Sequence, residues 1–182
     1  MRELALHLLD IAENSVSAHA DTVRITVEEN HTTDQLRMIV EDNGVGMSAE
    51  MVARVTDPFV TSRTTRKVGL GIPLLKAAAE GCDGGLTIQS TLGQGTCVTV
   101  EFQLSHIDRM PLGNLTSTLL TLVVGSPEVH WIFTYTVDGQ TFEFDDQPVK
   151  ETLDGIPLSD PEILKYLREL LETGIAELGG TA

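Results

Sequence analysis

Long apolar runs and cysteines are scarce in this chain. No apolar stretch among its 182 residues approaches the ~20 residues needed to span a bilayer, so we expect no membrane contact. The two cysteines, Cys82 and Cys97, lack metal-ligand spacing, which favours reduced thiols over a disulfide framework or a zinc site. No cleavable signal pattern opens the sequence. These absences predict a cytoplasmic protein.

Basic residues are also few. The chain holds 12 Lys and Arg against 27 Asp and Glu, which gives a formal net charge of −15. A nucleic acid needs a basic surface to neutralise its phosphates, so we expect no nucleic-acid partner. The acidity itself indicates a well-solvated surface. A nucleotide site in such a chain requires a local basic cluster or a metal ion.

The pattern up to residue 105 predicts an α+β fold. The expected elements run helix, two strands, helix, loop, helix, two strands, over residues 1–19, 21–28, 36–40, 48–55, 57–68, 72–80, 86–90 and 96–104. In the first helix, Leu4, Leu8, Ile11 and Ser15 fall on one stripe. Because strands adjacent in sequence pair readily, we expect a two-layer α/β sandwich, a mixed or antiparallel sheet with helices on one face.

After residue 105 this pattern breaks, and we expect a small acidic α+β appendage over 106–182 beside a first domain over 1–105. Helices are predicted over 115–124 and 161–178, and Asp138-Gly139 predicts a hairpin. Helix 115–124 and the region of Trp131 are expected to pack on the first domain as core. The alternative is a partner-docking or homodimer surface.

Asp10, Asn14 and Ser17 stand at i, i+4 and i+7 of the first helix, and Glu13 borders the face they share. Asp and Asn are poor helix-interior residues, so on an otherwise apolar helix we expect the stripe to line a cleft; a solvated face is the alternative. An Asn amide oxygen suits Mg²⁺. A carboxylate one turn away suits deprotonation of a hydroxyl or water.

Two glycine-bearing turns offer bare backbone to a ligand. Residues 42–47, Asp-Asn-Gly-Val-Gly-Met, end the second strand, and the Asp42 carboxylate can accept a hydrogen bond from an exocyclic amine such as adenine N6. Residues 93–96, Gly-Gln-Gly-Thr, form a hairpin turn whose Thr96 hydroxyl can reach a phosphate or a base. Taken alone, each also has an ordinary interpretation as a turn.

A third segment, Gly69-Leu70-Gly71, stands just before a helix. Amides at a helix N-terminus bind anions. The preceding loop holds Arg63, Arg66 and Lys67, a basic cluster that can neutralise a triphosphate or, alternatively, is simply solvated. Neither a Walker A loop nor a Rossmann fingerprint is present. His106 and Asp108 supply two metal ligands without a third, which favours a capped turn over a metal site.

The order of these segments carries more weight than any one of them. Leu-Leu-Asp-Ile-Ala-Glu-Asn-Ser, Glu-Asp-Asn-Gly-Val-Gly-Met, Asp-Pro-Phe, Gly-Leu-Gly-Ile and Gly-Gln-Gly-Thr-Cys-Val follow one another over residues 8 to 98. This order resembles the N, G1, F, G2 and G3 boxes of the GHKL superfamily, which includes gyrase, the large heat-shock chaperone, histidine kinases and MutL. The resemblance covers about the first 105 residues and implies the Bergerat fold with bound ATP and Mg²⁺.

The resemblance also implies roles for individual residues. Asn14 matches the magnesium-chelating Asn, and Asp10 stands where related kinases carry a general-base Glu, one methylene longer. Ser17 stands where many histidine kinases place a Lys. Asp42 matches the adenine-reading carboxylate. The other residues that match the nucleotide site are Gly44, Gly46, Met47, Phe59, Arg63, Arg66, Lys67, Gly69, Leu70, Gly71, Ile72 and Thr96.

The arrangement is similar to that of stand-alone anti-sigma kinases. The chain starts at the first-box helix, so we expect no phosphoacceptor hairpin before it, and none of the five histidines is followed by Asp or Glu. We expect a protein kinase that phosphorylates a partner protein, with an ATP-dependent binding module as the alternative. The loop over residues 57–68, which contains Phe59, matches the lid of the family and is short; this short lid and the acidic surface disfavour a MutL-like clamp. The whole chain also resembles ATP-binding proteins of anaerobic bacteria whose genes lie beside hydrogenase subunits, which implies a redox-linked partner.

Overall fold

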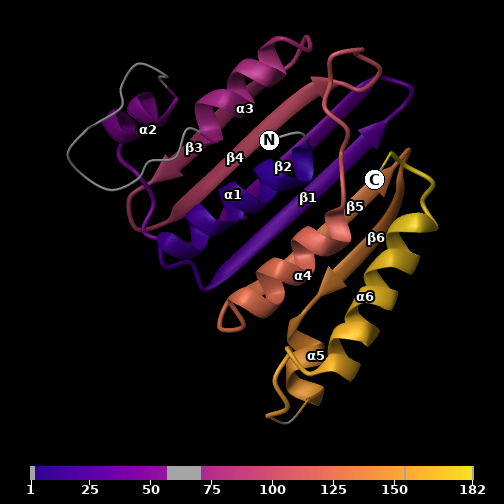
Figure 1. Cartoon of the computed structure of the whole chain (residues 1–182). Helices are drawn as coiled ribbons and strands as arrows, with labels where there is room; N and C mark the ends of the chain where they lie inside the picture. The colour runs from indigo at the N-terminus through magenta and orange to yellow at the C-terminus, as the bar shows by residue number, and fades with distance from the viewer. Residues whose placement is uncertain (1–2, 57–70, 154, 182) are drawn as a thin grey trace.

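A six-stranded mixed sheet and the helices along one of its faces make up the fold (Figure 1). The computed structural model describes residues 3–56, 71–153 and 155–181. Its elements are α1 (Leu4–Ser17), β1 (Thr22–Asn30), β2 (Gln35–Asp42), α2 (Ala49–Val55), α3 (Gly71–Glu80), β3 (Gly85–Thr91), β4 (Gly95–Gln103), α4 (Leu115–Gly125), β5 (His130–Val137), β6 (Gln140–Asp145), α5 (Gln147–Thr152) and α6 (Pro161–Ala176).

The strands lie in the order β3-β4-β2-β1-β5-β6. Three of the pairs are antiparallel hairpins between sequence neighbours, β1–β2, β3–β4 and β5–β6. Two long-range pairs join them: β2 with β4 is antiparallel and β1 with β5 is parallel. The predicted mixed sheet of a two-layer α+β fold is therefore confirmed.

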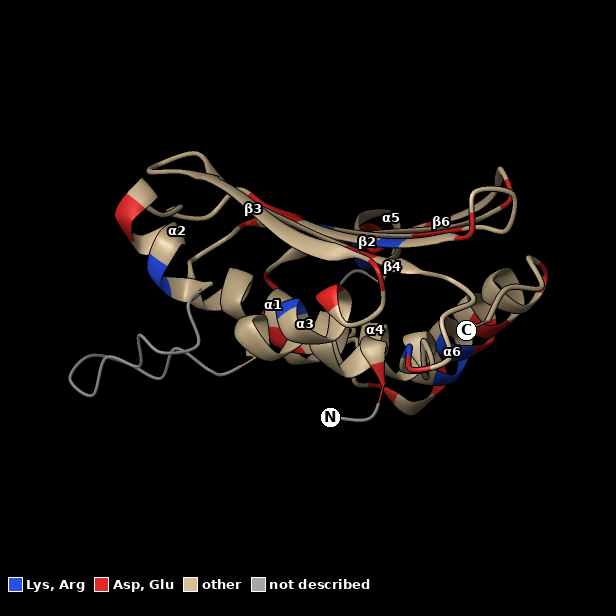
Figure 2. Ribbon diagram, turned by 90° about the horizontal axis from the view of Figure 1, so that it is seen from above, with Lys and Arg blue, Asp and Glu red and all other residues tan. Residues whose placement is uncertain are grey.

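Period-two alternation of apolar residues sets the two faces of the sheet. In β1, Val23, Ile25 and Val27 are buried while the residues between them are not. Figure 2 shows α1, α3, α4 and α6 on one side of the sheet, and the other face is bare over β2, β3 and β4. One continuous hydrophobic core fills the space between the two layers, as an amphipathic helix on a half-buried sheet requires.

The segment predicted as an appendage contributes to both layers. Strands β5 and β6 continue the sheet beyond β1, and α4 packs beside α1. Leu119 and Trp131, 2% exposed each, belong to the shared core. Of the two alternatives for α4 and Trp131, packing as core is the one observed. The domain boundary expected between residues 105 and 106 stays a prediction. Both the sheet and the hydrophobic core extend across that boundary.

Two local features were foreseen and one was not. Ser48 caps α2, because its hydroxyl accepts a hydrogen bond from the Met51 amide at 3.3 Å, as predicted. The hairpin at Asp138-Gly139 also forms, with φ of 48° and 87° at its two central residues. Helix α5 was not predicted. It buries no side chain and so has no apolar period to reveal it.

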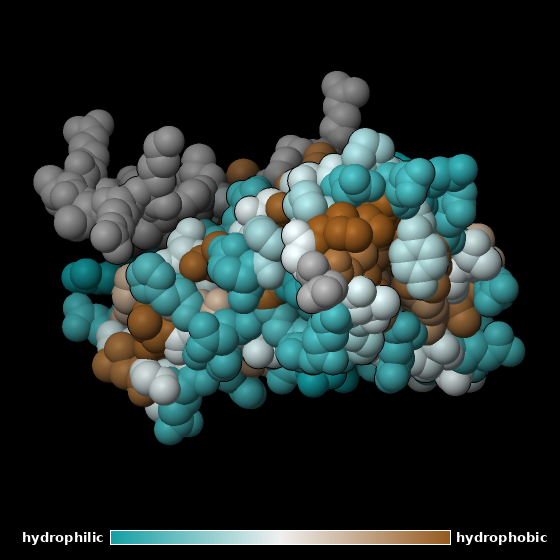
Figure 3. Space-filling view, turned by 90° about the horizontal axis from the view of Figure 1, so that it is seen from below, coloured by the Kyte–Doolittle hydropathy of each residue, from teal (hydrophilic) through white to brown (hydrophobic). Residues whose placement is uncertain are grey.

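Exposed apolar side chains occur in separate patches among hydrophilic residues, as Figure 3 shows for the face seen from below. Val45 (55% exposed) and Leu92 (66%) belong to neighbouring turns, where the Gly93 amide donates to the Val45 carbonyl at 2.8 Å. Across the described part of the chain, no helix combines the length and apolar composition needed to cross a membrane.

Candidate functional site

Helix α1 presents the predicted polar stripe. Asn14 and Ser17 are exposed and Asp10 is half-buried, whereas Leu8, Ile11 and Ala12 on the other side of the helix are buried. Across from Asp10 lies the start of α3: a Cβ built on Gly71 would sit 3.1 Å from Asp10 Oδ2. The structure therefore brings the Asp10 carboxylate against the first residue of α3, where amide donors and the positive end of the helix dipole gather.

Asp42 is held from three sides. Its Oδ1 accepts hydrogen bonds from the amides of Gly44 (2.9 Å) and Thr96 (3.2 Å). Its Oδ2 accepts from the Ser15 hydroxyl at 2.7 Å. The three donors come from the turn after β2, from β4 and from α1. Donors on both oxygens fix the plane of the carboxylate, so Asp42 is oriented before any ligand arrives.

Ser90 links the glycine turn at residues 42–47 to the one at residues 93–96. Its hydroxyl accepts from the Met47 amide (2.8 Å) and donates to the Gly95 carbonyl (2.9 Å). The Thr96 hydroxyl lies 2.9 Å from Ser90 Oγ. Since Ser90 spends its one proton on Gly95, the Thr96 hydroxyl is the donor of that pair, and the lone pairs of its oxygen stay available to a ligand donor.

Close backbone packing explains the glycines of the first turn. A Cβ on Gly44 would lie 2.6 Å from the Ala18 carbonyl oxygen, and one on Gly46 would lie 2.0 Å from that of Thr91. Any larger residue would push the turn away from α1 or from β3. These glycines allow the turn after Asp42 to pack closely against the end of α1 and against β3.

Several predicted site residues lie outside the described ranges. They are Phe59, Arg63, Arg66, Lys67, Gly69 and Leu70. Ile72 is described, half-buried in the first turn of α3. The structure thus brings together Asp10 with Gly71, and Asp42 with Thr96, Gly44 and Ser15. Asn14 lies on α1 between Asp10 and Ser15.

Burial lowers the pKa of His7, a titratable group close to Asp10. His7 precedes Asp10 by one turn and is 4% exposed. Desolvation lowers the pKa of its imidazole, and the Asp10 carboxylate opposes part of that effect. Its Nδ1 has no hydrogen-bond partner in the described part of the chain. Burial therefore favours the neutral imidazole of His7, one turn before Asp10 on α1.

One cluster of potential metal ligands lies away from α1 in the described part of the chain. Among the described residues, only His130, Asp145 and Asp146 place three ligand atoms together. The Lys150 ammonium lies 2.6 Å from Asp146 Oδ2 and supplies the positive charge there. His106 accepts a hydrogen bond at Nδ1 from the Asp108 amide (3.2 Å), which is the capped turn that the sequence favoured.

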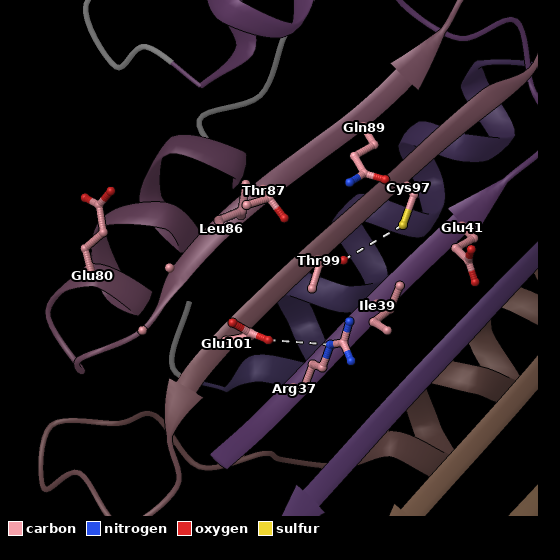
Figure 4. Close-up of a pocket in the computed structure, with 12 residues that line it drawn as sticks. Arg37, Ile39, Glu41, Glu80, Leu86, Thr87, Gln89, Cys97, Thr99 and Glu101 are labelled. Atoms are coloured by element: carbon pink, nitrogen blue, oxygen red, sulfur yellow. Dashed lines mark hydrogen bonds and ion pairs between the residues drawn. The ribbon is translucent and has the colours of Figure 1, made fainter.

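A hollow of about 500 Å³ lies on the bare face of the sheet, over β2, β3 and β4 (Figure 4). Arg37, Thr99 and Glu101 line it, and the Arg37 guanidinium lies 3.6 Å from Glu101 and 3.7 Å from Glu28. The two carboxylates neutralise this cation. The side chains of Leu36, Met38 and Val40 point the other way, into the core, so the hollow is separated from α1 by the sheet.

Two residues of the site, Ser15 and Ser90, were not predicted as site residues from the sequence. Ser15 was placed on the apolar stripe of α1, and it is indeed buried, but its hydroxyl bonds Asp42. A polar residue on a buried stripe, directly after the exposed Asn14, was the available signal. Ser90 lies in a strand with no motif around it, and only the pairing of β3 with β4 reveals its role.

Comparisons with known proteins agree with this geometry. Residues 1–106 match the family model described as histidine kinase-, DNA gyrase B-, and HSP90-like ATPase. Sensor protein kinase FleS of Pseudomonas aeruginosa is 39% identical over 97 residues, which cover 53% of this chain and 24% of that protein. The non-motile and phage-resistance protein of Caulobacter vibrioides is 33% identical over 111 residues, covering 56% of this chain and 13% of the relative. The chain thus spans about a quarter or less of these relatives.

Solved structures show the same fold at low sequence identity. The MutL ATPase domain of Aquifex aeolicus, complexed with ADP, has a TM-score of 0.52 and 16% identity, and the match covers 85% of this chain and 68% of that one. The N-terminal domain of a DNA repair protein has a TM-score of 0.54 and 14% identity over 79% of this chain and 52% of the other. Both matches cover a larger share of the chain than residues 1–106 alone, so they include part of the segment beyond the family match.

Proposed function

Because this chain belongs to the histidine kinase-, DNA gyrase B-, and HSP90-like ATPase family, with an ATP-binding domain related to those of histidine kinases, we propose that it transfers the γ-phosphate of ATP to a partner protein. The observation that carries this proposal is that α1 contacts two other parts of the site. Asp10 lies against Gly71 at the start of α3, and Ser15 bonds Asp42. One helix therefore links a phosphate end to a base end, five residues and about 7.5 Å apart along its axis.

The residues at each end fit Mg-ATP. At the base end, Asp42 is an oriented acceptor for the adenine amino group, and the glycine turn holds the backbone close. At the phosphate end, the start of α3 offers amide donors, and the absence of a side chain on Gly71 lets the Asp10 carboxylate approach them closely. Asn14, exposed between the two ends, would hold Mg²⁺ through its amide oxygen. When bound, the ion would neutralise phosphate charge.

Asp10 is the group placed to move a proton. In the proposed transfer, the Asp10 carboxylate accepts the proton of a Ser or Thr hydroxyl, or of a His ring nitrogen, on the partner protein. The freed lone pair forms the new bond to the γ-phosphorus while the bond from that phosphorus to the β–γ bridging oxygen breaks, and ADP leaves with the bond's electrons. His7, buried and neutral below Asp10, adds no charge that would compete for the carboxylate.

The partner is a separate protein in this proposal. None of the five histidines of the chain is followed by Asp or Glu, and the resemblance implies a redox-linked regulatory target. The proposed setting is the cytoplasm, where ATP is plentiful. A second copy of the chain stays a further candidate partner.

Three variants separate transfer from binding. Wild type, Asp10→Asn and Asn14→Ala are incubated with γ-labelled ATP and a lysate of the source cells, and ATP affinity is measured in parallel by calorimetry with magnesium present. We expect wild type to label a protein, Asp10→Asn to bind ATP but label nothing, and Asn14→Ala to lose magnesium-dependent ATP affinity. Glu172→Gln, an exposed helix carboxylate on α6, is the control and should match wild type.

The same variants test the alternative, an ATP-dependent conformational switch. A switch that needs only ATP occupancy leaves regulation of the partner unchanged in Asp10→Asn and abolishes it in Asn14→Ala. Label transfer by Asp10→Asn at the wild-type rate would remove the proposed base from the reaction. No heat with any adenine nucleotide would end the proposal altogether.

A further inference from the structure

Ser15 is a buried hydroxyl that joins two parts of the site. It is 3% exposed on α1, and its hydroxyl donates to Asp42 Oδ2 at 2.7 Å. The alternative acceptor for its single proton is the Ile11 carbonyl one turn back, at 3.4 Å. The shorter bond to a carboxylate oxygen is the stronger one.

Lone pairs on Asp42 are nearly all in use. Two backbone amides, from Gly44 and Thr96, occupy Oδ1, and Ser15 occupies one position on Oδ2. A carboxylate offers about four acceptor positions, two on each oxygen. One position therefore remains, on the oxygen that Ser15 holds.

We propose that Ser15 is a positioning residue that sets the base selectivity of the site, by aiming the remaining lone pair of Asp42 Oδ2 at the 6-amino group of an adenine base. The inference rests on the proposed ATP site and deepens it. A 6-oxo purine places an acceptor where the amino group would donate. Lone pair then faces lone pair, and a buried acceptor is left unpaired.

Loss of the Ser15 hydroxyl frees only one side of Asp42. Both remaining donors act on Oδ1, so Oδ2 is no longer anchored and the carboxylate gains freedom to turn about its terminal torsion. Asp42 is half-buried, so water can take the vacated position. Selectivity then falls, because the acceptor is no longer preorganised for the amino group.

ATP and inosine triphosphate, which carries a 6-oxo group and a protonated N1, are the probes. Their dissociation constants are measured by calorimetry, with magnesium, for wild type, Ser15→Ala, Ser15→Thr and Ser117→Ala. We expect wild type to prefer ATP, and Ser15→Ala to lose about ten-fold of that preference, equivalent to about 1.4 kcal/mol, through weaker ATP binding. Ser15→Thr keeps the hydroxyl and should restore the preference. Ser117→Ala, an exposed helix serine on α4, should equal wild type.

Each outcome decides the matter. Equal weakening of both nucleotides in Ser15→Ala, or an unchanged ratio, would show a structural role only and overturn the proposal. Wild type that binds the two nucleotides equally well would overturn it as well. Wild type that binds neither nucleotide would reject the ATP site itself, a different failure. Alanine is the best helix former, so Ser15→Ala is expected to fold, and the thermal midpoint of each variant verifies it.

Discussion

Two glycines of one turn, Gly93 and Gly95, offer a paired test of how tightly Asp42 is held. Both have positive φ, 76° and 114°. A Cβ on Gly93 would meet nothing within 4 Å, whereas a Cβ on Gly95 would lie 1.9 Å from the Asp42 carbonyl oxygen. Alanine at Gly93 therefore carries a backbone cost alone, and alanine at Gly95 carries that cost together with a collision.

The magnitudes separate the two variants. A left-handed alanine costs about 1–2 kcal/mol, and forced overpacking adds about 1–3 kcal/mol. Gly93→Ala should thus destabilise by about 1–2 kcal/mol and Gly95→Ala by about 2–5 kcal/mol. In a chain of this size each kcal/mol corresponds to about 2–4 °C in the thermal midpoint.

The two variants should differ more in ATP affinity than in the free energy of unfolding. The collision is with Asp42, the base-reading residue of the proposed ATP site, and it should also displace the Thr96 amide that bonds Asp42. Gly95→Ala should weaken ATP binding at least about ten-fold, while Gly93→Ala should change it less than about two-fold. Denaturant unfolding and calorimetric titration measure the two effects. Equal losses of stability and affinity in both variants would refute the claim that contact with Asp42 makes Gly95 necessary.

Two further predictions concern buried charge. Burial lowers the pKa of His7 below its ordinary value of 6.5. Below that pH the unfolded chain therefore binds more protons than the folded chain, and the free energy of unfolding decreases as the pH falls through 6.5. Urea unfolding at pH 7.5 and 5.5 should show a smaller decrease for His7→Gln than for wild type. Lys150→Met removes the ion-pair partner of the fully buried Asp146 and should lower the free energy of unfolding by about 3–5 kcal/mol. Lys165→Met breaks only the exposed pair with Glu169 and should lower it by less than about 0.5 kcal/mol. Urea unfolding measures both losses. Equal costs for the two lysine variants, or equal pH dependence in His7→Gln, would contradict these assignments.

Local chemistry made much of the fold predictable. Alternation located the strands within a few residues, and the caps and hairpin turns at Ser48 and Asp138-Gly139 form as their residue types predict. The parallel pairing of β1 with β5 was not foreseen. It joins Thr22 to His130 and Val23 to Trp131, and no turn chemistry specifies a contact over such a separation.

In the candidate site too, residues within sequence motifs were predictable, whereas a residue that only the fold brings into place was not. Motif order identified Asp42, Gly44, Gly46 and Thr96, and the structure places them together. Ser15 was not predicted as a site residue, because helical periodicity assigns it to the buried core face of α1, where an apolar role is expected. A hydrogen bond between residues 15 and 42 requires the angle between helix and sheet, which periodicity does not contain.

The part of the chain beyond the family match helps to position the site. The first amides of α1, on Leu4 and Ala5, donate to the carbonyls of Pro111 (3.0 Å) and Leu112 (2.8 Å), and no side chain caps this helix. On α4, the Thr118 hydroxyl donates to the Ala5 carbonyl at 3.3 Å. A helix whose first turn is held by backbone rather than by its own cap cannot shift without breaking those bonds. Since α1 carries Asp10, Asn14 and Ser15, these bonds to residues 111–118 help to fix the position of the three side chains in the proposed site.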